Sequence, residues 1–425
     1  MDSGRRLAVI GGGWAGLAAA VEATGRGDRV VLFEMARSLG GRARDVDVGG
    51  QVLDNGQHLC IGAYSETLRL LRTVGVAESD AFLRLPLRLH YPDQQGLALG
   101  AGPPALAFAL AVLRHPGWHW RDKAALLKAA AQWLATGFRS DPRQTVAELS
   151  TALPAAIRAD LIEPLCVAAL NTPAATASAA VFLRILQDAL FSGRGSADFL
   201  LPRTGLGDIF PAPAARWLAK AGAEIRLGRR VQALLACGAA WHVDDERFDG
   251  IVVAASPAES ARLVGPIATD WADAALKLAY EPIVTVYLQS PGTRLPEPVL
   301  ALRADAQAPA QFVFDRGQLG GPPGLLAFVI SGAGRWVEAG TDATLVATHR
   351  QAASALHGWL RAPARTVQVV TEKRATFACT PQLVRPAMRI APHLCAAGDY
   401  IRGPYPATLE GAVRAGVAAA SAWRD

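Results

Sequence analysis

No apolar stretch of the chain is long enough to cross a membrane, although 51% of its 425 residues are hydrophobic and its mean hydropathy is +0.20. A membrane-spanning helix needs about 20 consecutive, predominantly apolar residues. We therefore do not expect a transmembrane protein. The apolar surplus must lie in a core, in an apolar ligand pocket, or on a surface that rests on lipid.

Cysteine is scarce, and none of the cysteines has the C-x-x-C spacing of a zinc or redox site. The five are Cys60, Cys166, Cys237, Cys379 and Cys395. We interpret them as reduced thiols of a cytoplasmic protein and predict no metal site. Because the first predicted strand begins within about ten residues of the start, we also expect no signal peptide.

Long basic tracts are missing as well. The formal charge is +6 and the isoelectric point is about 9.3, but the arginines are scattered along the chain. A nucleic-acid-binding protein typically gathers its basic residues on a patch or stripe, so we do not expect a nucleic acid partner. Attraction to an anionic membrane surface is compatible with this charge.

The start of the chain carries the most informative pattern, a short apolar run that leads directly into closely spaced glycines. Residues 7–10 have the length of a buried strand, and residues 17–23 indicate a helix rich in small side chains. The glycines between them follow G-x-G-x-x-G spacing, which allows a tight turn, close approach of a pyrophosphate, and packing of helix on strand. We predict a dinucleotide cofactor with its phosphates at the helix N-terminus. The residues expected to bind it here are Gly11, Gly13, Trp14, Ala15 and Gly16.

A second strand, residues 29–33, ends on Glu34. An acidic side chain about 20 residues beyond the first glycine can hold the hydroxyls of an adenosine ribose. Further along, Gly40 and Gly41 expose backbone N–H groups, and Arg42 offers a fork of donors to a phosphate. The sequence therefore predicts a second phosphate contact close to the first.

The run Arg37-Ser38-Leu39-Gly40-Gly41-Arg42 resembles the second glycine motif of flavoproteins of the amine oxidase and phytoene desaturase superfamily. The strand that ends in Gly398 and Asp399 likewise resembles the last FAD motif of this superfamily. The resemblance implies FAD as the cofactor and a closing helix whose N-terminus faces the flavin. It implies the following further FAD-binding residues: Gly41, Arg42, Gly56, Val231, Gly398, Asp399, Thr408 and Leu409.

Three further segments are more specific than these superfamily motifs. They are DNGQH at 54–58, ALNTP at 169–173 and YPATLEG at 405–411, and they resemble the squalene-associated flavoproteins, the hydroxysqualene dehydroxylases of the bacterial hopanoid route. This resemblance implies reductive dehydroxylation of hydroxysqualene to squalene, with hydride from reduced FAD and loss of water. It implies a long apolar isoprenoid substrate and an electron donor that the sequence does not identify.

Such a reaction needs an acid that protonates the departing hydroxyl group. His58 is the first candidate, because its segment lies beside the flavin in the superfamily. Asp54 is expected to orient His58 or to replace it as the acid. Tyr64, Tyr405 and Glu410 stay open as further donors.

We predict an α/β and α+β architecture with a Rossmann-type FAD-binding domain on a parallel sheet and a substrate domain of antiparallel sheet and helices. The FAD-binding domain is expected at 1–85, 201–262 and 385–425, and the substrate domain at 86–200 and 263–384. Residues 103–139 indicate two helices joined by a tip that contains Trp118 and Trp120. This hairpin either contacts lipid headgroups or packs inside the domain. A peripheral position on the inner face of the cytoplasmic membrane would follow from the first alternative.

Two other functions fit the same sequence. One is another reaction on this scaffold, by a carotenoid-type desaturase or isomerase or by an amine oxidase; Lys277 and Lys373, the lysines considered for an amine oxidase site, are isolated. The other is an FAD-bearing carrier of polyisoprenoids, in which the flavin has only a structural role.

Overall fold

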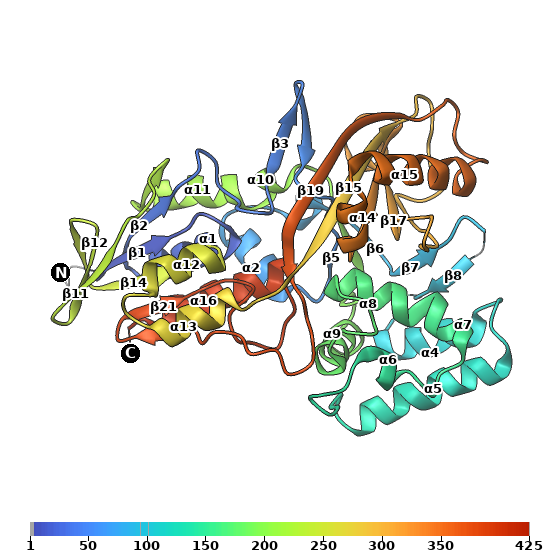
Figure 1. Ribbon diagram of the computed structural model, residues 1–425, viewed down its shortest axis with the longest axis horizontal. Coiled ribbons are helices and arrows are strands. Elements are labelled where there is room, and N and C mark those ends of the chain that lie inside the picture. The colour runs from blue at the N-terminus through green and yellow to red at the C-terminus, as the bar shows by residue number, and fades with distance from the viewer. Residues whose placement is uncertain (1–3, 94, 101, 425) are drawn as a thin grey trace.

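The computed structural model describes residues 4–93, 95–100 and 102–424, and a six-stranded sheet organises one half of it (Figure 1). Five strands are parallel, and β20 pairs with β21 in the antiparallel sense. In spatial order the strands are β10 (Glu224–Leu227), β2 (Arg29–Glu34), β1 (Arg6–Ile10), β14 (Gly250–Val253), β21 (Leu394–Ala396) and β20 (Arg389–Ala391). The carboxyl ends of β1, β2, β14 and β21 therefore meet at one edge, where ligands of such sheets bind.

Helices flank this sheet. They are α1 (Trp14–Gly25), α11 (Pro211–Lys220), α12 (Pro257–Val264), α13 (Thr269–Leu276) and α16 (Leu409–Ala422). Helices α1 and α16 approach each other closely, because a Cβ atom on Gly416 would lie 2.1 Å from the Ala15 carbonyl oxygen. The first and last helices of the cofactor half are thus packed backbone against backbone.

A five-stranded antiparallel sheet forms the second half. Its order is β16 (Val299–Ala301), β17 (Phe312–Asp315), β18 (Leu325–Ile330), β15 (Tyr280–Gln289) and β19 (Arg365–Phe377). Val284, Val286 and Leu288 of β15 are buried in a cluster with residues of α14 (Gly334–Ala339) and α15 (Thr341–Ala355). The alternate residues Thr285 and Tyr287 bond instead to the segment 54–57. The expected combination of a parallel and an antiparallel sheet is confirmed.

A group of helices fills the lower right of Figure 1, away from the parallel sheet. Its elements are α4 (Pro104–Arg114), α5 (Trp120–Ala135), α6 (Val146–Leu149), α7 (Ala155–Ile157), the π-helix η1 (Arg158–Ile162), α8 (Glu163–Leu170) and α9 (Ala179–Phe191). The expected hairpin of two helices at 103–139 is confirmed as α4 and α5. Among the described residues, no helix is long and apolar enough to cross a membrane.

The remaining elements are short. They are β3 (Asp45–Val48), β4 (Gln51–Asp54), β5 (Cys60–Ile61), α2 (Ser65–Thr73), α3 (Glu78–Ala81), β6 (Phe82–Leu85), β7 (Arg88–His90), β8 (Gln95–Ala98), β9 (Phe199–Pro202), α10 (Leu206–Ile209), β11 (Leu234–Cys237), β12 (Ala240–Val243), β13 (Glu246–Phe248) and the 3₁₀ helix η2 (Arg316–Leu319). Strand β9 pairs with both β5 and β6. The domain boundaries given above stay a prediction. Helix α13 falls in the predicted substrate domain, but it packs on α12 and its Trp271 donates a hydrogen bond to Ala387, and both Ala387 and most of α12 belong to the predicted FAD-binding domain.

The first helix starts earlier than expected. It begins at Trp14 and not at residue 17, because Gly13 is its N-cap. Residues 201–207 contain the end of β9 and the start of α10, and partners distant in sequence satisfy their backbone. Strands β13 and β14 are separated at Asp249, whose carboxylate accepts a hydrogen bond from the Arg6 amide.

The two tryptophans of the helical hairpin lie in different surroundings. Trp118 is only 4% exposed, stacks on His115 and donates a hydrogen bond to the Asp160 carboxylate at 3.2 Å. Trp120 is 65% exposed. Of the two alternatives for the hairpin, packing inside the domain describes Trp118, because that indole has a buried stacking partner and a carboxylate acceptor, whereas the ring of Trp120 is exposed.

Candidate flavin and active site

The turn after β1 has no room for side chains. Gly11 has φ +115°, and a Cβ atom there would lie 2.4 Å from the Ala254 carbonyl oxygen; a Cβ atom on Gly16 would lie 1.9 Å from the Gly11 carbonyl oxygen. Trp14 and Ala15 begin α1 directly after this turn, and both are buried. The backbone at the helix N-terminus is thus exposed to a ligand in the way that a phosphate requires.

The two glycine motifs lie side by side. The Gly40 amide donates a hydrogen bond to the Gly12 carbonyl at 2.9 Å. A Cβ atom on Gly13 would lie 3.8 Å from the Cα atom of Gly41, which has φ +63°. Neither glycine presents a side chain to the other, so this pair forms a cradle of backbone atoms that a pyrophosphate can approach.

Glu34 closes the cradle at the end of β2. Its Oε2 atom accepts a hydrogen bond from the Gly12 amide at 2.6 Å, and its Oε1 atom accepts one from Ala36 at 2.7 Å. The side chain is 9% exposed. A carboxylate fixed against the glycine turn in this way can accept hydrogen bonds from ribose hydroxyls.

An ion pair joins the first and last motifs. Arg42 Nη2 lies 2.6 Å from Asp399 Oδ1, and Arg42 Nη1 donates to the Ala375 carbonyl at 2.6 Å. Asp399 follows Gly398, where a Cβ atom would lie 2.6 Å from the Tyr400 ring. Segments at opposite ends of the chain therefore meet where a dinucleotide would bridge them.

The remaining expected cofactor contacts lie on the same half. Thr408 accepts a hydrogen bond from the Gly411 amide at 3.0 Å and so caps α16, which begins at Leu409. Val231 is buried, and its carbonyl accepts a hydrogen bond from Arg262 at 2.5 Å. Taken with the glycine cradle and Glu34, these residues fit an FAD molecule extended along the carboxyl edge of the sheet.

His58 lies between β4 and β5. Its Nδ1 atom is 2.6 Å from the Gly56 carbonyl oxygen, so Nδ1 carries the hydrogen and donates it. Burial lowers the pKa of His58, with the nearby Arg42 charge acting in the same direction. The imidazole is therefore neutral at pH 7, and the Gly56 carbonyl orients it. Asp54, the expected orienting residue, has different partners.

Asp54 is 3% exposed and is enclosed by several elements. Its Oδ1 atom accepts a hydrogen bond from the Leu206 amide at 3.0 Å, and its backbone carbonyl accepts one from the Tyr287 hydroxyl. Within the described residues, Oδ2 has no hydrogen-bond donor; the Arg316 guanidinium lies 3.9 Å from it. Burial raises the pKa of Asp54 to about 6.

Two groups near Asp54 were not predicted from the sequence. Arg316 donates a hydrogen bond to the Gln57 side chain at 3.2 Å, and the Gln57 amide donates one to Thr285. These contacts hold the segment between Asp54 and His58 against β15 and η2. No local signal identifies Arg316, because its partners lie more than two hundred residues earlier in the chain.

The other candidate acids have structural partners. Glu410 is 1% exposed and accepts hydrogen bonds from the Glu66 and Thr67 amides at the start of α2, while Arg414 donates to it at 2.7 Å. The Tyr405 hydroxyl accepts a hydrogen bond from Arg184. Burial raises the pKa of Tyr64, which makes its phenol a weaker acid than free tyrosine.

Comparison with known protein families identifies the family of this chain. The sequence pattern of the flavin containing amine oxidoreductases matches residues 14–422. The chain belongs to this family. It is an oxidoreductase, and its cofactor is FAD. A hydroxysqualene dehydroxylase of Rhodopseudomonas palustris is 29% identical over 97% of this chain and 96% of that protein, and one of Sinorhizobium fredii is 26% identical over 98% and 97%.

Solved structures agree on the fold. The structure of an oxidoreductase from Methanosarcina mazei superimposes on this chain with a TM-score of 0.70 and 16% sequence identity. The superposition covers 97% of this chain and 99% of that protein. At this identity the likeness concerns the fold alone. It extends over both sheets and the helical group.

We expect Glu34→Ala and Asp399→Ala each to weaken FAD binding about tenfold, which corresponds to about 1.4 kcal/mol. The first removes the carboxylate expected at the ribose, and the second releases Arg42 from its ion pair. Fluorescence titration of the deflavinated proteins measures the change in Kd. Asp273→Ala, an exposed substitution on α13, serves as the control and should bind FAD like the wild type. Wild-type affinity in both test variants would contradict the assignment.

Proposed function

We propose that this flavoprotein removes the hydroxyl group of hydroxysqualene reductively and releases squalene and water. The observation that carries the proposal is similarity over nearly the whole length to relatives of that name. The apolar composition supports it, because a thirty-carbon polyene alcohol needs an apolar site and no charged binding group. An external electron donor, which the sequence does not identify, would reduce the cofactor.

FAD, when bound and reduced, supplies the hydride that replaces the hydroxyl group. The chain itself must hold the polyene and deliver one proton to the hydroxyl oxygen, so that it departs as water. We assign this proton to Nε2 of His58 in its doubly protonated form, because Nδ1 keeps its hydrogen bond to the Gly56 carbonyl. A proton donor must reach the substrate; His58 is partly exposed, whereas the Asp54 side chain is 1% exposed. Asp54 would then act as a positioning residue that fixes the start of the segment 54–58 through Leu206 and Tyr287.

The deciding experiment is anaerobic turnover. Chemically reduced protein is mixed with hydroxysqualene, flavin absorbance is followed, and the product is identified by mass spectrometry. We expect the flavin to be reoxidised as squalene forms. Flavin that stays reduced would support the carrier alternative. Flavin reduction when oxidised protein meets a polyene would support a desaturase.

We further propose that the protein rests on the inner face of the cytoplasmic membrane through a lipid-facing patch on its helical group. The patch consists of Leu106, Leu110, Leu113, Trp120, Leu134 and Phe191, all of them exposed. Arg114, Arg121, Lys123 and Lys128 lie on the same two helices and outnumber Asp122. An exposed apolar surface rimmed by basic residues suits an anionic bilayer.

We expect Trp120→Ser combined with Leu113→Ser to reduce binding to anionic vesicles about tenfold or more, because each side chain loses its apolar burial in the interface. Vesicle sedimentation measures the partition. Leu276→Ser, an exposed substitution on α13, should sediment like the wild type. Equal sedimentation of all forms would show that the patch does not contact the membrane. FAD content should not change in any of them.

A further inference from the structure

The helical group contains an apolar cavity of about 200 Å³ that lies between α4, α5, η1, α8 and α9. Every residue that lines it is apolar, with Phe108, Leu127, Trp133 and Phe182 among them. Close packing normally leaves few voids larger than a water molecule. An apolar cavity of this kind excludes water and favours a hydrocarbon ligand.

The cavity opens on the lipid-facing patch. Leu134 and Phe191 belong both to its lining and to the exposed surface, with 54% and 41% of their side chains accessible. Ala105 and Ala109 of α4 line the cavity, and their neighbours Leu106 and Leu110 are exposed on the patch. A hydrocarbon could therefore pass from the patch into the cavity without meeting a charged group among these residues.

One side of the cavity is formed by a π-helical turn. Leu161 and Ile162, which line it, belong to the π-helix η1. Asp160 of the same turn is held elsewhere, because its carboxylate accepts hydrogen bonds from Trp118 at 3.2 Å and Arg303 at 3.1 Å. π-Helical turns are rare and frequently occur at functional sites. The widened turn directs apolar side chains toward the cavity, while its acidic residue is anchored away from it.

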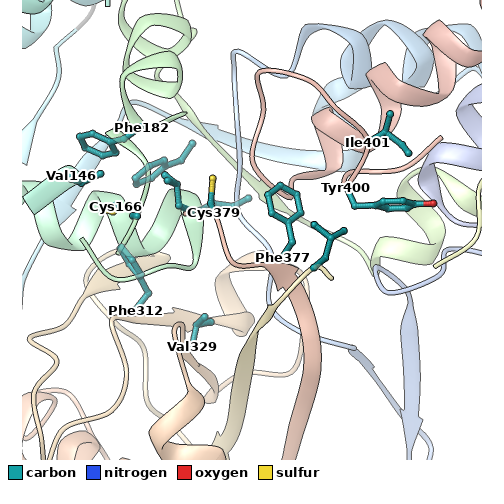
Figure 2. Packing of buried hydrophobic residues seen from close by; sticks show 14 of the residues in the cluster. Val146, Cys166, Phe182, Phe312, Val329, Phe377, Cys379, Tyr400 and Ile401 are labelled. Atoms are coloured by element: carbon teal, nitrogen blue, oxygen red, sulfur yellow. The ribbon is translucent and has the colours of Figure 1, made fainter. Parts of the chain in front are cut away.

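Beyond the cavity, closely packed buried side chains connect the helical group to the cofactor half. Phe182 lines the cavity and is also the start of a row of buried apolar side chains that Figure 2 shows. The row passes Cys166 and Cys379 to Phe377 and ends near Tyr400, next to Asp399 of the FAD motif. The cavity and the cofactor half thus share one apolar core cluster.

We propose that this cavity binds one end of a linear isoprenoid chain that enters from the lipid-facing patch. The kind of chain rests on the proposed function. An apolar cavity of about 150 Å³ is known to accept benzene, so this cavity accommodates about one or two isoprene units and not a whole thirty-carbon chain. The rest of a longer chain must lie outside the cavity.

A photoreactive probe tests the proposal. FAD-loaded protein in detergent micelles is irradiated with a linear thirty-carbon isoprenoid hydrocarbon that carries a diazirine at one end, and labelled peptides are mapped by mass spectrometry. We expect labels on Leu127, Leu161 or Phe182. Labels confined to the exposed Leu110 and Leu113, or to the cofactor half, would overturn the proposal.

Matched substitutions on α5 sharpen the test. Ala130→Trp fills the cavity and should reduce the internal labels at least about tenfold, whereas Ala124→Trp places the same side chain on the exposed face of that helix and should label like the wild type. Ala109→Leu narrows the cavity from α4 and replaces Ala130→Trp if that variant does not fold. Undiminished internal labels in the folded cavity variant would overturn the proposal.

The probe has no hydroxyl group, so its labelling does not depend on dehydroxylation. Internal labels in a protein that fails to dehydroxylate hydroxysqualene would refute the proposed function and leave the chain-binding cavity standing. Turnover of hydroxysqualene without internal labels would refute the cavity and leave the function standing. The two proposals therefore fail separately.

Discussion

His58→Ala is expected to slow the reoxidation of reduced flavin by hydroxysqualene about 100-fold or more in a single turnover, because the departing hydroxyl loses its proton donor. FAD content should be unchanged, since the glycine cradle and Glu34 do not contact this side chain in the described structure. Stopped-flow absorbance measures the rate. Tyr64→Phe and Tyr405→Phe, which remove the alternative phenols, should react like the wild type.

The same measurement has a predicted pH dependence. His58 donates a proton from Nε2 only when its imidazole is doubly protonated, because Nδ1 already donates to Gly56. Burial lowers the pKa of His58 below its usual value of about 6.5. The rate should therefore be highest at acid pH and should fall about tenfold per pH unit above that pKa. A wild-type rate in His58→Ala, or a profile independent of pH from 5.5 to 8, would show that His58 is structural.

The cofactor half was predictable because its signals are local. The glycine turn, the strand that ends on Glu34 and the start of α1 all lie within residues 6–34 and follow from backbone sterics. The Arg42 and Asp399 pairing could be expected only from the resemblance, since the two residues are 357 positions apart. Their spatial meeting depends on β21 lying beside β14 in the sheet.

The surroundings of the proposed acid were not predictable in the same way. Arg316, Thr285 and Tyr287 reach the segment 54–58 from the antiparallel sheet and its flanking 3₁₀ helix, and no periodicity marks them. The burial of Trp118 and the exposure of Trp120 were likewise not predictable, because a pattern of aromatic and basic residues does not reveal which ring has a buried hydrogen-bond acceptor. The acceptor of Trp118 is Asp160, 42 residues later.

Asp54 gives the second large expected effect, on stability. Its pKa is raised by burial from 3.8 to about 6 in the folded protein. The folded state therefore holds this proton more tightly than the unfolded state. The resulting contribution to the free energy of unfolding is greatest below about pH 4 and is lost as the pH rises through about 6. A shift of about two units corresponds to about 3 kcal/mol.

Asp54→Asn cannot ionise, while its side-chain oxygen can still accept the Leu206 hydrogen bond. Relative to the wild type, the FAD-loaded variant should gain about 3 kcal/mol in free energy of unfolding between pH 4 and pH 7.5. Urea unfolding at the two pH values measures this difference, and the titration of groups that do not interact with Asp54 cancels between the two proteins. A difference that does not change with pH would mean that Arg316, 3.9 Å from Oδ2, compensates the buried carboxylate fully. In that case Asp54 and Arg316 form an ion pair in the folded protein, and Arg316→Gln should destabilise the protein more at pH 7.5 than at pH 4.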